Sequence, residues 1–444
     1  MTVSEMAIPA SKRRNGSDLK QDFQMLIEDK TDKNRELAFI ATGRENSIFS
    51  EDMRHFEGQL TDKLKGKRVL AIGAAGSIGS ATISVISGFE PSALHVIDQN
   101  ENELAELVRT LRSSSGGFSV TDFRTLPLDF GSPATRLFIH DQSPYDFVLN
   151  FAAIKHVRSE KDSFSMLQMF DTNLLKQARL LRWLGEAQFK GRYFSVSTDK
   201  AANPSSFMGA SKRLMEHVMF SGEAVKDFGA EIVSARFANV AFSNGSLLQS
   251  FPRRIEQAQP LAAPIDTRRY FVSMEEAGQL CTLAAVCAPD QHIVVPKLSP
   301  DEHLVLLEDV AKAFLEHLKL KPVIFSDETK AVQATSLLRG TGSWPLLLTP
   351  LDTAGEKAYE EFVANGESAV DGAFAALSVV KYKSAASGSI GRLINSLEDL
   401  FAAANMSTLP QQIDKDQLKE LVAAVEPSFL QTYKASAKTL DSRI

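Results

Sequence analysis

Cysteine is nearly absent from this chain of 444 residues, which contains only Cys281 and Cys287. Two cysteines in one apolar stretch predict buried, reduced side chains, and they exclude a disulfide framework or a cysteine-rich metal site. Also absent is any run of about 18 apolar residues, the length that a membrane-spanning helix requires. The N-terminus lacks the apolar core of a secretion signal. We therefore expect a cytoplasmic protein without a membrane span and without a bound metal.

The chain also has no excess of basic residues, because it contains 49 Lys and Arg residues and 55 Asp and Glu residues. The resulting net charge of −6 provides no electrostatic footprint for nucleic acid. The basic cluster at residues 12–14 is short and lies near the terminus, so it is predicted to be a solvated tail. Hydrophobic residues make up 44% of the chain, which suffices for the core of one large domain or two.

Glycine is concentrated where it is informative, in residues 73–79 (Gly-Ala-Ala-Gly-Ser-Ile-Gly). A strand-like apolar segment precedes this turn, a helical segment follows it, and a second strand ends at Asp98. Strand, glycine turn, helix, strand and acid in this order predict a dinucleotide-binding unit. Glycines let the backbone approach a pyrophosphate, and the helix N-terminus stabilises its charge. Asp98 follows the last glycine at the spacing of a ribose-binding acid, and its charge favours NAD over NADP.

Further cofactor contacts are expected where the later strands end. Asn150 ends the fourth strand, and the small residues after it allow a close approach to a flat ring or a ribose. Asp129 follows the third strand and is placed to meet the adenine amine, although a helix or turn cap explains it equally well. The predicted NAD-binding residues are Gly73, Gly76, Ser77, Ile78, Gly79, Asp98, Asp129, Asn150, Ala152, Ala153 and Lys212.

Strands and helices alternate from residue 67 to residue 240, which predicts a parallel sheet with helices on both faces. We expect an α/β protein with a Rossmann-type doubly wound parallel sheet, a smaller mixed substrate-binding lobe, and helical N- and C-terminal extensions. The expected strands are 68–72, 94–97, 119–127, 147–151, 193–197 and 232–237, with helices at 101–113, 167–186 and 211–228. The lobe is expected to contain helices at 251–258, 274–287 and 304–318.

Four regions are expected along the chain. Residues 1–65 form a lead-in that is partly disordered and then helical, and residues 66–240 form the NAD-binding domain. Residues 241–365 form the substrate-binding lobe, interleaved with that domain. Residues 366–444 form a mostly helical C-terminal extension.

The sequence also lacks the tyrosine that is expected to exchange a proton beside the cofactor. Lys212 opens a helix with the spacing of a Tyr-x-x-x-Lys dyad. In that dyad the lysine contacts the nicotinamide ribose, and the tyrosine takes a proton as hydride leaves the substrate. Met208 stands at the tyrosine position and has no transferable proton.

The chain resembles the extended short-chain dehydrogenases, and within them the nucleotide-sugar 4,6-dehydratases of bacterial polysaccharide biosynthesis. The resemblance covers roughly residues 66–300 and implies NAD-dependent dehydration of a UDP-sugar, UDP-N-acetylglucosamine above all. It also implies a tightly bound, recycled NAD and a homo-oligomer. The segments that carry it are 73–79, 150–156, 197–204, 208–213, 236–240, 245–246 and 269–271, and residues 352–357 are similar to one soluble subgroup.

The resemblance assigns a role to each residue of the segment after the fifth strand. Asp199 is the acid at the sugar C6 oxygen, Lys200 is the base at C5, and Thr198 binds the C4 oxygen. A lysine works as a base only when its pKa is depressed, which burial and the neighbouring Lys212 provide. Because Met208 replaces the tyrosine, the C4 proton leaves through Thr198, Asp199 or water, and the sequence does not choose among them. The predicted catalytic residues are Thr198, Asp199, Lys200, Met208 and Lys212.

The substrate contacts implied by the resemblance are Asn239, Ser246 and Arg269, and a planar guanidinium suits a diphosphate. Lys155 and His156 are either substrate contacts or an ordinary loop pair. Within the fold, Asn173 is expected to be a structural polar residue near Lys212.

Two other functions stay open. A 4-epimerase on the same scaffold uses the tyrosine that Met208 replaces, so the sequence argues against it. A non-catalytic NAD-sensing regulatory protein is compatible with Met208. The retention of Thr198, Asp199, Lys200 and Lys212 together argues against such a sensor, which needs only the cofactor contacts.

Overall fold

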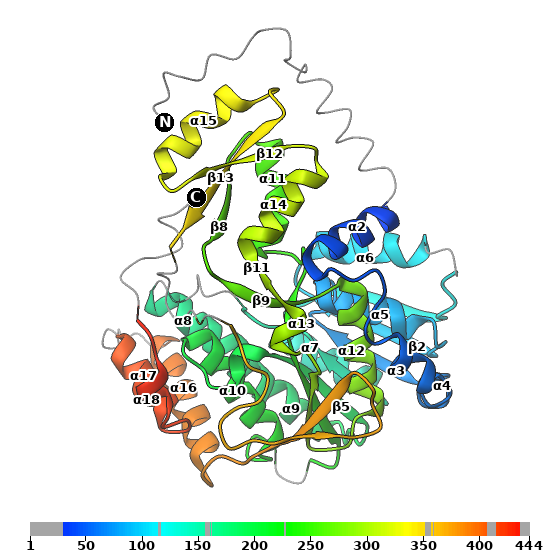
Figure 1. Ribbon diagram of the computed structural model, residues 1–444. Coiled ribbons are helices and arrows are strands. Elements are labelled where there is room, and N and C mark those ends of the chain that lie inside the picture. Colours follow the sequence, from blue (N-terminus) through cyan, green and yellow to red (C-terminus); the bar gives the residue numbers. More distant parts are fainter. Residues whose placement is uncertain are drawn as a thin grey trace.

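A nine-stranded sheet organises the chain in the computed structural model (Figure 1). The structure describes residues 30–113, 117–155, 160, 162–225, 228–350, 357, 359–405 and 414–435. The strands are β1 (Arg68–Ile72), β2 (Ala93–Asp98), β3 (Asp122–Pro127), β4 (Phe147–Asn150), β5 (Arg192–Thr198), β6 (Glu231–Phe237), β7 (Asn239–Val240), β8 (Leu261–Pro264), β9 (Arg268–Val272), β10 (His292–Pro296), β11 (Leu304–Leu306), β12 (Lys321–Phe325), β13 (Ser343–Thr349), β14 (Ala369–Asp371) and β15 (Leu377–Lys381).

Helices connect and cover these strands. The helices are α2 (Lys30–Thr42), α3 (Ser50–His55), α4 (Glu57–Leu64), α5 (Ser77–Ser87), α6 (Glu101–Arg112), α7 (Pro133–Gln142), α8 (Ser163–Phe170), η4 (Asp171–Leu175), α9 (Lys176–Glu186), η5 (Asp199–Ala201), α10 (Phe207–Phe220), α11 (Leu247–Glu256), α12 (Met274–Cys287), α13 (Pro300–His303), α14 (Leu307–His317), α15 (Glu328–Leu338), α16 (Ser389–Asn405), α17 (Lys415–Ala423) and α18 (Phe429–Thr432). Within the described residues, no helix is both long and apolar enough to cross a bilayer.

The main sheet has the order β14-β15-β10-β6-β5-β4-β1-β2-β3. Its run from β3 to β10 is parallel throughout, and β15 and then β14 extend it with antiparallel pairing. The central strands are apolar and buried on both faces, as expected when helices cover both sides of a parallel sheet. The predicted doubly wound sheet is confirmed, and so are all six predicted strands, although β3 begins three residues late.

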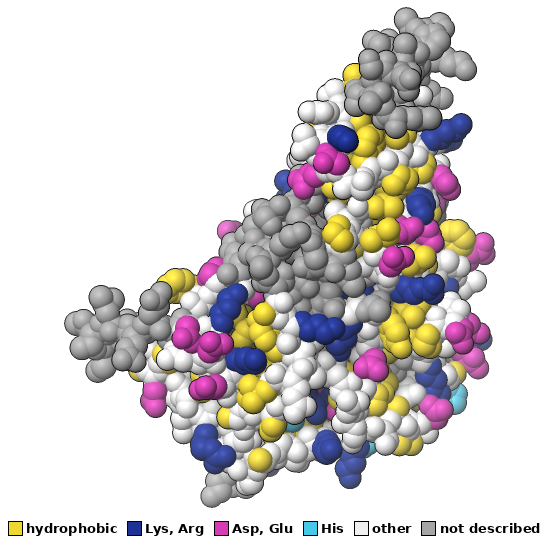
Figure 2. Space-filling model, turned by 60° about the vertical axis from the view of Figure 1, so that its left-hand side comes forward, with side chains coloured by type: hydrophobic (Ala, Val, Ile, Leu, Met, Phe, Trp, Pro, Cys, Tyr) yellow, Lys and Arg dark blue, Asp and Glu magenta, His cyan; other side chains and the backbone are white. Residues whose placement is uncertain are grey.

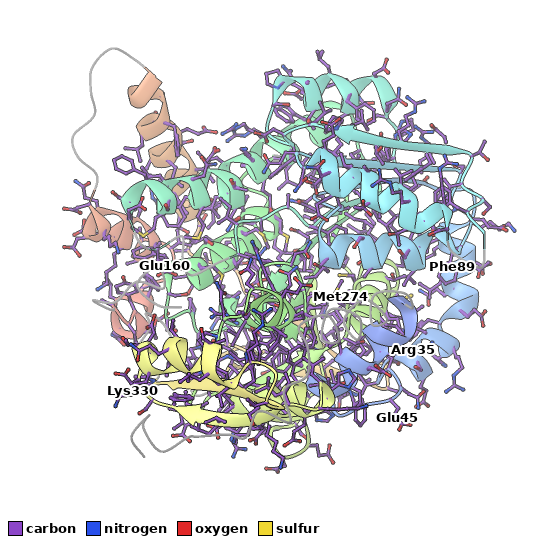
Figure 3. All side chains as sticks on the ribbon, turned by 90° about the horizontal axis from the view of Figure 1, so that it is seen from above. Arg35, Glu45, Phe89, Glu160, Met274 and Lys330 are labelled. Atoms are coloured by element: carbon purple, nitrogen blue, oxygen red, sulfur yellow. The ribbon has the colours of Figure 1, made fainter. Side chains whose placement is uncertain are left out.

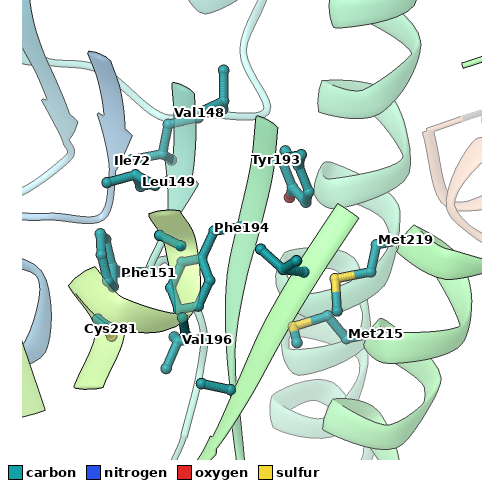
Figure 4. Close-up of a cluster of buried hydrophobic side chains, with 14 of the residues drawn as sticks. Ile72, Val148, Leu149, Phe151, Tyr193, Phe194, Val196, Met215, Met219 and Cys281 are labelled. Atoms are coloured by element: carbon teal, nitrogen blue, oxygen red, sulfur yellow. The ribbon is translucent and has the colours of Figure 1, made fainter. Parts of the chain in front are cut away.

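Helices pack on both faces of this sheet. Figure 4 shows Met215 and Met219 of α10 on one side of strand β5, and Cys281 of α12 on the other. Tyr193 points toward α10 and Phe194 toward α12, because neighbouring residues of a strand face opposite ways. All of these side chains are buried and belong to one hydrophobic cluster, so the core of this domain lies on both faces of the sheet.

Several helix predictions need correction. The helix predicted at 211–228 is α10, which starts at Phe207 because Ser206 caps it by accepting a hydrogen bond from the Gly209 amide, and which already ends at Phe220. Residues 304–306 form strand β11 before α14 begins, since they pair with β9. The helix predicted at 274–287 for the lobe is α12, which instead packs on α5 and the main sheet. Its Gly278 approaches Ala81 of α5 so closely that an added Cβ would lie 2.7 Å from the Ala81 oxygen.

The smaller lobe contains two three-stranded sheets, β11-β9-β7 and β12-β13-β8, with their own core. Phe251 of α11, Phe314 of α14 and Trp344 of β13 form the centre of that core and are almost completely buried. Figure 2 shows the acidic and basic side chains of one face of the molecule interspersed, so that face presents no field of one sign.

Both extensions are tied to the sheet domain. In the lead-in, the Arg44 guanidinium binds both carboxylate oxygens of Glu276 on α12. The buried Asp52 of α3 accepts hydrogen bonds from the amides of Ala375 and Ala376, just before β15. The C-terminal extension first supplies β14 and β15, which the expectation of a helical extension had missed, and only then the helices α16 to α18.

Candidate active site

A cleft of about 1090 Å³ opens beyond the carboxyl ends of β1, β2, β4 and β5, where doubly wound sheets bind their ligands. It extends from the glycine turn to the end of β5 and on to the loop after β7. The predicted site residues that line it are Gly73, Gly76, Ser77, Ile78, Gly79, Asp98, Asp129, Ala152, Ala153, Lys155, Thr198, Lys200, Met208, Lys212, Asn239 and Ser246. Among the predicted site residues, Asn150, Asp199 and Arg269 do not line it, and His156 lies outside the described residues.

The glycine turn is shaped by two close backbone approaches. Gly73 has a φ of +66°, and a Cβ there would lie 2.5 Å from the Cα of Ala152. A Cβ on Gly79 would lie 2.4 Å from the Cα of Ala74, so helix α5 packs against its own turn only with glycine at this position. Gly76 is the N-cap of α5, whose free N–H groups therefore face the cleft.

The two acids at the strand ends have different surroundings. Asp98 ends β2 and accepts a hydrogen bond of 3.2 Å from the Ala75 amide, which fixes its carboxylate beside the glycine turn. Asp129 caps its own turn by accepting from the Gly131 amide, and it forms an ion pair of 2.6 Å with Lys176. The turn-cap explanation of Asp129 is therefore correct, and the residue also lines the cleft.

Two predicted contacts, Asn150 and Arg269, are placed differently from the expectation. Asn150 is buried and accepts a hydrogen bond from the Ala152 amide while donating to the Tyr193 hydroxyl. It shapes the loop after β4 rather than the cleft surface. Arg269 is buried beside the cleft, where it donates to the carbonyl of Lys357. Lys155 is exposed within the cleft, and desolvation by the surrounding protein lowers the pKa of its amine.

The backbone turns at the end of β5, so that the side chains of Thr198, Asp199 and Lys200 can act together. Neighbouring strand residues point to opposite faces, so Thr198, Asp199 and Lys200 can act together only if the backbone turns. The chain does turn, into the short helix η5. The Thr198 hydroxyl donates to Asp199 Oδ1 at 2.7 Å, and Lys200 Nζ lies 3.2 Å from the same oxygen.

Asp199 lies behind the cleft surface, with 1% of its area exposed, whereas Thr198 and Lys200 reach the cleft. Its second oxygen, Oδ2, has no hydrogen-bond partner in the described part of the chain. Gly209 permits this packing, because a Cβ there would lie 2.4 Å from the Lys200 carbonyl oxygen. Helix α10 therefore begins directly against η5.

Lys212 is buried on α10, and its Nζ donates to the Val196 carbonyl at 2.7 Å. Burial lowers the pKa of Lys212 to about 7, and the negative charge of Glu216 opposes part of this shift. Met208 also lines the cleft one turn earlier on the helix. A lysine that is near its midpoint at neutral pH responds strongly to any charge placed beside it.

Some polar residues that hold this site were not predicted. Glu160 accepts a hydrogen bond from the Met208 amide at 2.9 Å, and burial raises the pKa of its carboxyl. Figure 3 shows Glu160 near the C-terminal helices, and Lys415 of α17 donates to its carbonyl. Asn173 is structural, as predicted, but it binds the Ser211 hydroxyl directly and both backbone groups of Ile154.

A buried ion network lies beneath the site and joins α10 to the C-terminal extension. Arg236 has no exposed surface and binds Glu216 of α10 and Glu367 with both ends of its guanidinium. Arg213 bridges Glu216, Glu367 and Glu426. The Ser197 hydroxyl of β5 donates to Glu216 at 2.6 Å. The acidic partners of Arg236 lie far from it in the chain, and nothing in the local sequence indicated them.

The sheet order and the glycine turn define an α/β protein with a Rossmann-type doubly wound sheet. Residues 69–381 match the family described as "Polysaccharide biosynthesis protein", and the chain belongs to this family. The resemblance predicted from the sequence motifs is therefore confirmed at the level of the family.

Named relatives support this assignment at low identity. The probable polysaccharide biosynthesis protein EpsC of Bacillus subtilis is 27% identical over 365 residues, covering 79% of this chain and 55% of EpsC. A UDP-N-acetylglucosamine 4,6-dehydratase (inverting) of Campylobacter jejuni is 25% identical over 215 residues, covering 48% of this chain and 61% of the relative. Relatives named UDP-glucose 4-epimerase also match. The chain thus spans little more than half the length of EpsC.

Among solved structures, that of Pen from Bacillus thuringiensis superposes with a TM-score of 0.58 at 20% sequence identity. The match covers 76% of this chain and 98% of Pen. At this identity the similarity concerns the fold alone.

Proposed function

We propose that this protein catalyses the NAD-dependent 4,6-dehydration of a nucleotide sugar, with UDP-N-acetylglucosamine as the expected substrate, for surface polysaccharide or glycan biosynthesis. The observation that carries the proposal is one cleft with the glycine turn and Asp98 at one end and Thr198 and Lys200 at the other. Asp199 lies directly behind this second end, in contact with both neighbours. The name of the Campylobacter jejuni relative supports the same reaction.

The residues at the first end of the cleft fit NAD. Gly73 and Gly79 leave no room for a Cβ, which suits a backbone that must approach a pyrophosphate. The Asp98 carboxylate would bind the adenosine ribose, and Lys212 would face the nicotinamide ribose. Bound NAD would supply the hydride acceptor for sugar C4 and the hydride donor for C6.

The proposed reaction requires the net transfer of one proton within the sugar. The product is a 4-keto-6-deoxy sugar, so the C6 hydroxyl leaves as water and takes with it the proton from the C4 hydroxyl. The protein therefore has to carry one proton from O4 to O6 in every turnover. In the proposed route, Thr198 receives the O4 proton and passes its own to Asp199, over the 2.7 Å hydrogen bond between them. Asp199 then protonates O6, and Met208 needs no proton.

Lys200 serves as the base at C5 in this proposal. Its neutral amine removes the C5 proton, the C–H electrons form the C5–C6 double bond, and the C6–O bond breaks. The resulting Lys200 ammonium exchanges its protons with solvent and later delivers one of them to C5. Lys200 Nζ lies 3.2 Å from Asp199 Oδ1, so the neutral base stands beside the carboxylate that receives the O4 proton, and each turnover returns both groups to this state.

Mass spectrometry of UDP-N-acetylglucosamine incubated with the protein in D₂O tests this function. The expected product has lost one water and carries one deuterium at C5, without net formation of NADH. The variants K200M and D199N should abolish it, and T198V should slow it because it interrupts the relay from O4. Unchanged substrate in the presence of bound NAD would overturn the proposal for this sugar.

The relatives named UDP-glucose 4-epimerase favour one alternative, epimerisation at C4. It predicts a product of unchanged mass with inverted C4, which the same sample distinguishes by chromatography. Met208 weakens this alternative, because the position one turn before Lys212 on α10 holds a methionine in place of the phenol that would exchange the C4 proton.

A further inference from the structure

Helix α16 of the C-terminal extension reaches the cleft that is proposed to bind the cofactor. Its residues Leu393, Ile394 and Leu397 are buried in the core of the sheet domain, and the helix lies beside α10 (Figure 1). Phe401, one turn after Leu397, packs against the same core and lines the cleft. The helix also contacts η4, and Thr172 of η4 lines the cleft as well. Among the described residues that line the cleft, Phe401 alone comes from the C-terminal extension.

Polar contacts at both ends of α9 and α10 fix the course of α16. Just after the end of α10, the Glu223 carboxylate accepts hydrogen bonds from the amides of Gly388 and Gly391 at the start of α16. Further along, Glu398 of α16 forms an ion pair of 2.7 Å with Arg182 of α9. Because α10 begins at the cleft and ends close to Glu223, α16 runs back toward the cleft.

Helix α9 connects this part of α16 to the loop after β3. One turn nearer the cleft than the ion pair with α16, Arg179 donates to the carbonyl of Gly131 at 3.4 Å. Lys176 forms its ion pair of 2.6 Å with Asp129 of the same loop, and these four residues line the cleft. Strand β3 pairs with β2, which ends at Asp98. This side of the cleft therefore contains the acid that is expected to bind a ribose.

We propose that Phe401 is a cofactor-binding residue whose ring contacts the adenine of the dinucleotide, so that the C-terminal extension completes the NAD site. This inference rests on the proposed binding of NAD in the cleft. The ribose that Asp98 would bind carries the adenine, which places the base on the side of the cleft where α9 and α16 lie. Phe401 is only partly buried, which leaves part of its ring accessible to a ligand. A planar base gains affinity from contact with an aromatic face.

Binding of ADP-ribose, which contains the adenine half of NAD without the nicotinamide, tests this inference by titration calorimetry and needs no turnover. F401A is expected to raise the Kd for ADP-ribose and for NAD about tenfold, because it removes the aromatic face. F401L keeps an apolar side chain against the core and should still lose about threefold, whereas F401Y should restore most of the affinity. F164A is the matched control, since 78% of Phe164 is exposed and it does not line the cleft.

Hydrogen exchange gives a second readout, because a ligand that contacts α16 should slow the exchange of its amides. ADP-ribose should protect α16 in the wild type and in F164A, and much less in F401A. The affinity of the NAD-loaded protein for UDP should be the same in F401A as in the wild type. A folded F401A or F401L that binds ADP-ribose as tightly as the wild type, or that loses affinity for UDP instead, overturns the inference and leaves the proposed function intact. The expected loss, in a protein whose wild type binds NAD but never dehydrates the sugar, supports the role of Phe401 and overturns the proposed reaction.

Discussion

Replacing Lys212 with methionine is expected to stabilise the protein while it abolishes the proposed reaction. The ordinary pKa of a lysine is 10.5, and burial lowers that of Lys212 to about 7. A shift of about 3.5 units corresponds to about 5 kcal/mol at 1.36 kcal/mol per unit. Between these two pH values the unfolded chain binds more protons than the folded one, so stability rises with pH. The destabilisation by Lys212 is therefore largest at and below neutral pH.

The net effect of K212M follows from two opposing contributions. At pH 7 the variant no longer carries a cost of about 4 kcal/mol for the buried amine. It loses the hydrogen bond to the Val196 carbonyl, which costs about 1–3 kcal/mol when the acceptor stays buried. We expect a net gain of about 2 kcal/mol at pH 7. This gain should vanish by pH 9, because the wild type itself becomes about 2 kcal/mol more stable over that range.

Urea unfolding of the cofactor-free protein, followed by tryptophan fluorescence at pH 7, 8 and 9, measures this difference. The matched control is K321M, since Lys321 is exposed at the start of β12. The control should show no change with pH relative to the wild type. A K212M protein that is less stable at pH 7, or whose advantage does not shrink toward pH 9, would refute the assignment of Lys212 as a buried amine near its midpoint.

Three further predictions concern the ion network, the ribose acid and the glycine turn. Burial alone would raise the pKa of Glu367, but the hydrogen bond and charge of Arg236 outweigh it and lower the pKa to about 2. The stability from this pair is present above pH 4.5 and is lost as the pH falls toward 2. E367Q should therefore cost about 3–5 kcal/mol at pH 7 and flatten the loss of stability in acid, measured by urea unfolding. D98N should reduce the preference for NAD over NADP about tenfold, a change of about 1.4 kcal/mol by titration calorimetry, and an unchanged preference would exclude Asp98 from the ribose site. G79A should cost about 1–3 kcal/mol and weaken NAD binding, because its Cβ meets backbone, whereas G58A, with open space around its Cβ, should be neutral in thermal unfolding.

The sequence predicted best what is determined locally. Strands β1, β2, β4, β5 and β6 are largely apolar and buried, and the glycine turn carries its spacing within seven residues. The start of α10 was misplaced because its boundary depends on the Ser206 cap, a weaker signal than the apolar pattern after Lys212. The turn at η5 was recognised as a necessary condition, yet nothing local indicated that Asp199 would be buried behind its neighbours.

Features that depend on distant partners could not be predicted. Strand β15 pairs with β10, and the pattern of residues 377–381 does not identify that partner. Glu216, Glu367 and Glu426 are ordinary acids in the sequence, and only the fold brings them to Arg213 and Arg236.

The antiparallel end of the main sheet has a consequence for synthesis on the ribosome. Strand β10 is made about 80 residues before β15 covers its open edge. At about 5–20 residues per second, this edge stays unpaired for roughly 4–16 s in each nascent chain. An unpaired strand edge is a template for wrong association. The completed sheet is therefore a late product of translation, and the nascent chain should depend on chaperones most strongly between the emergence of β10 and that of β15.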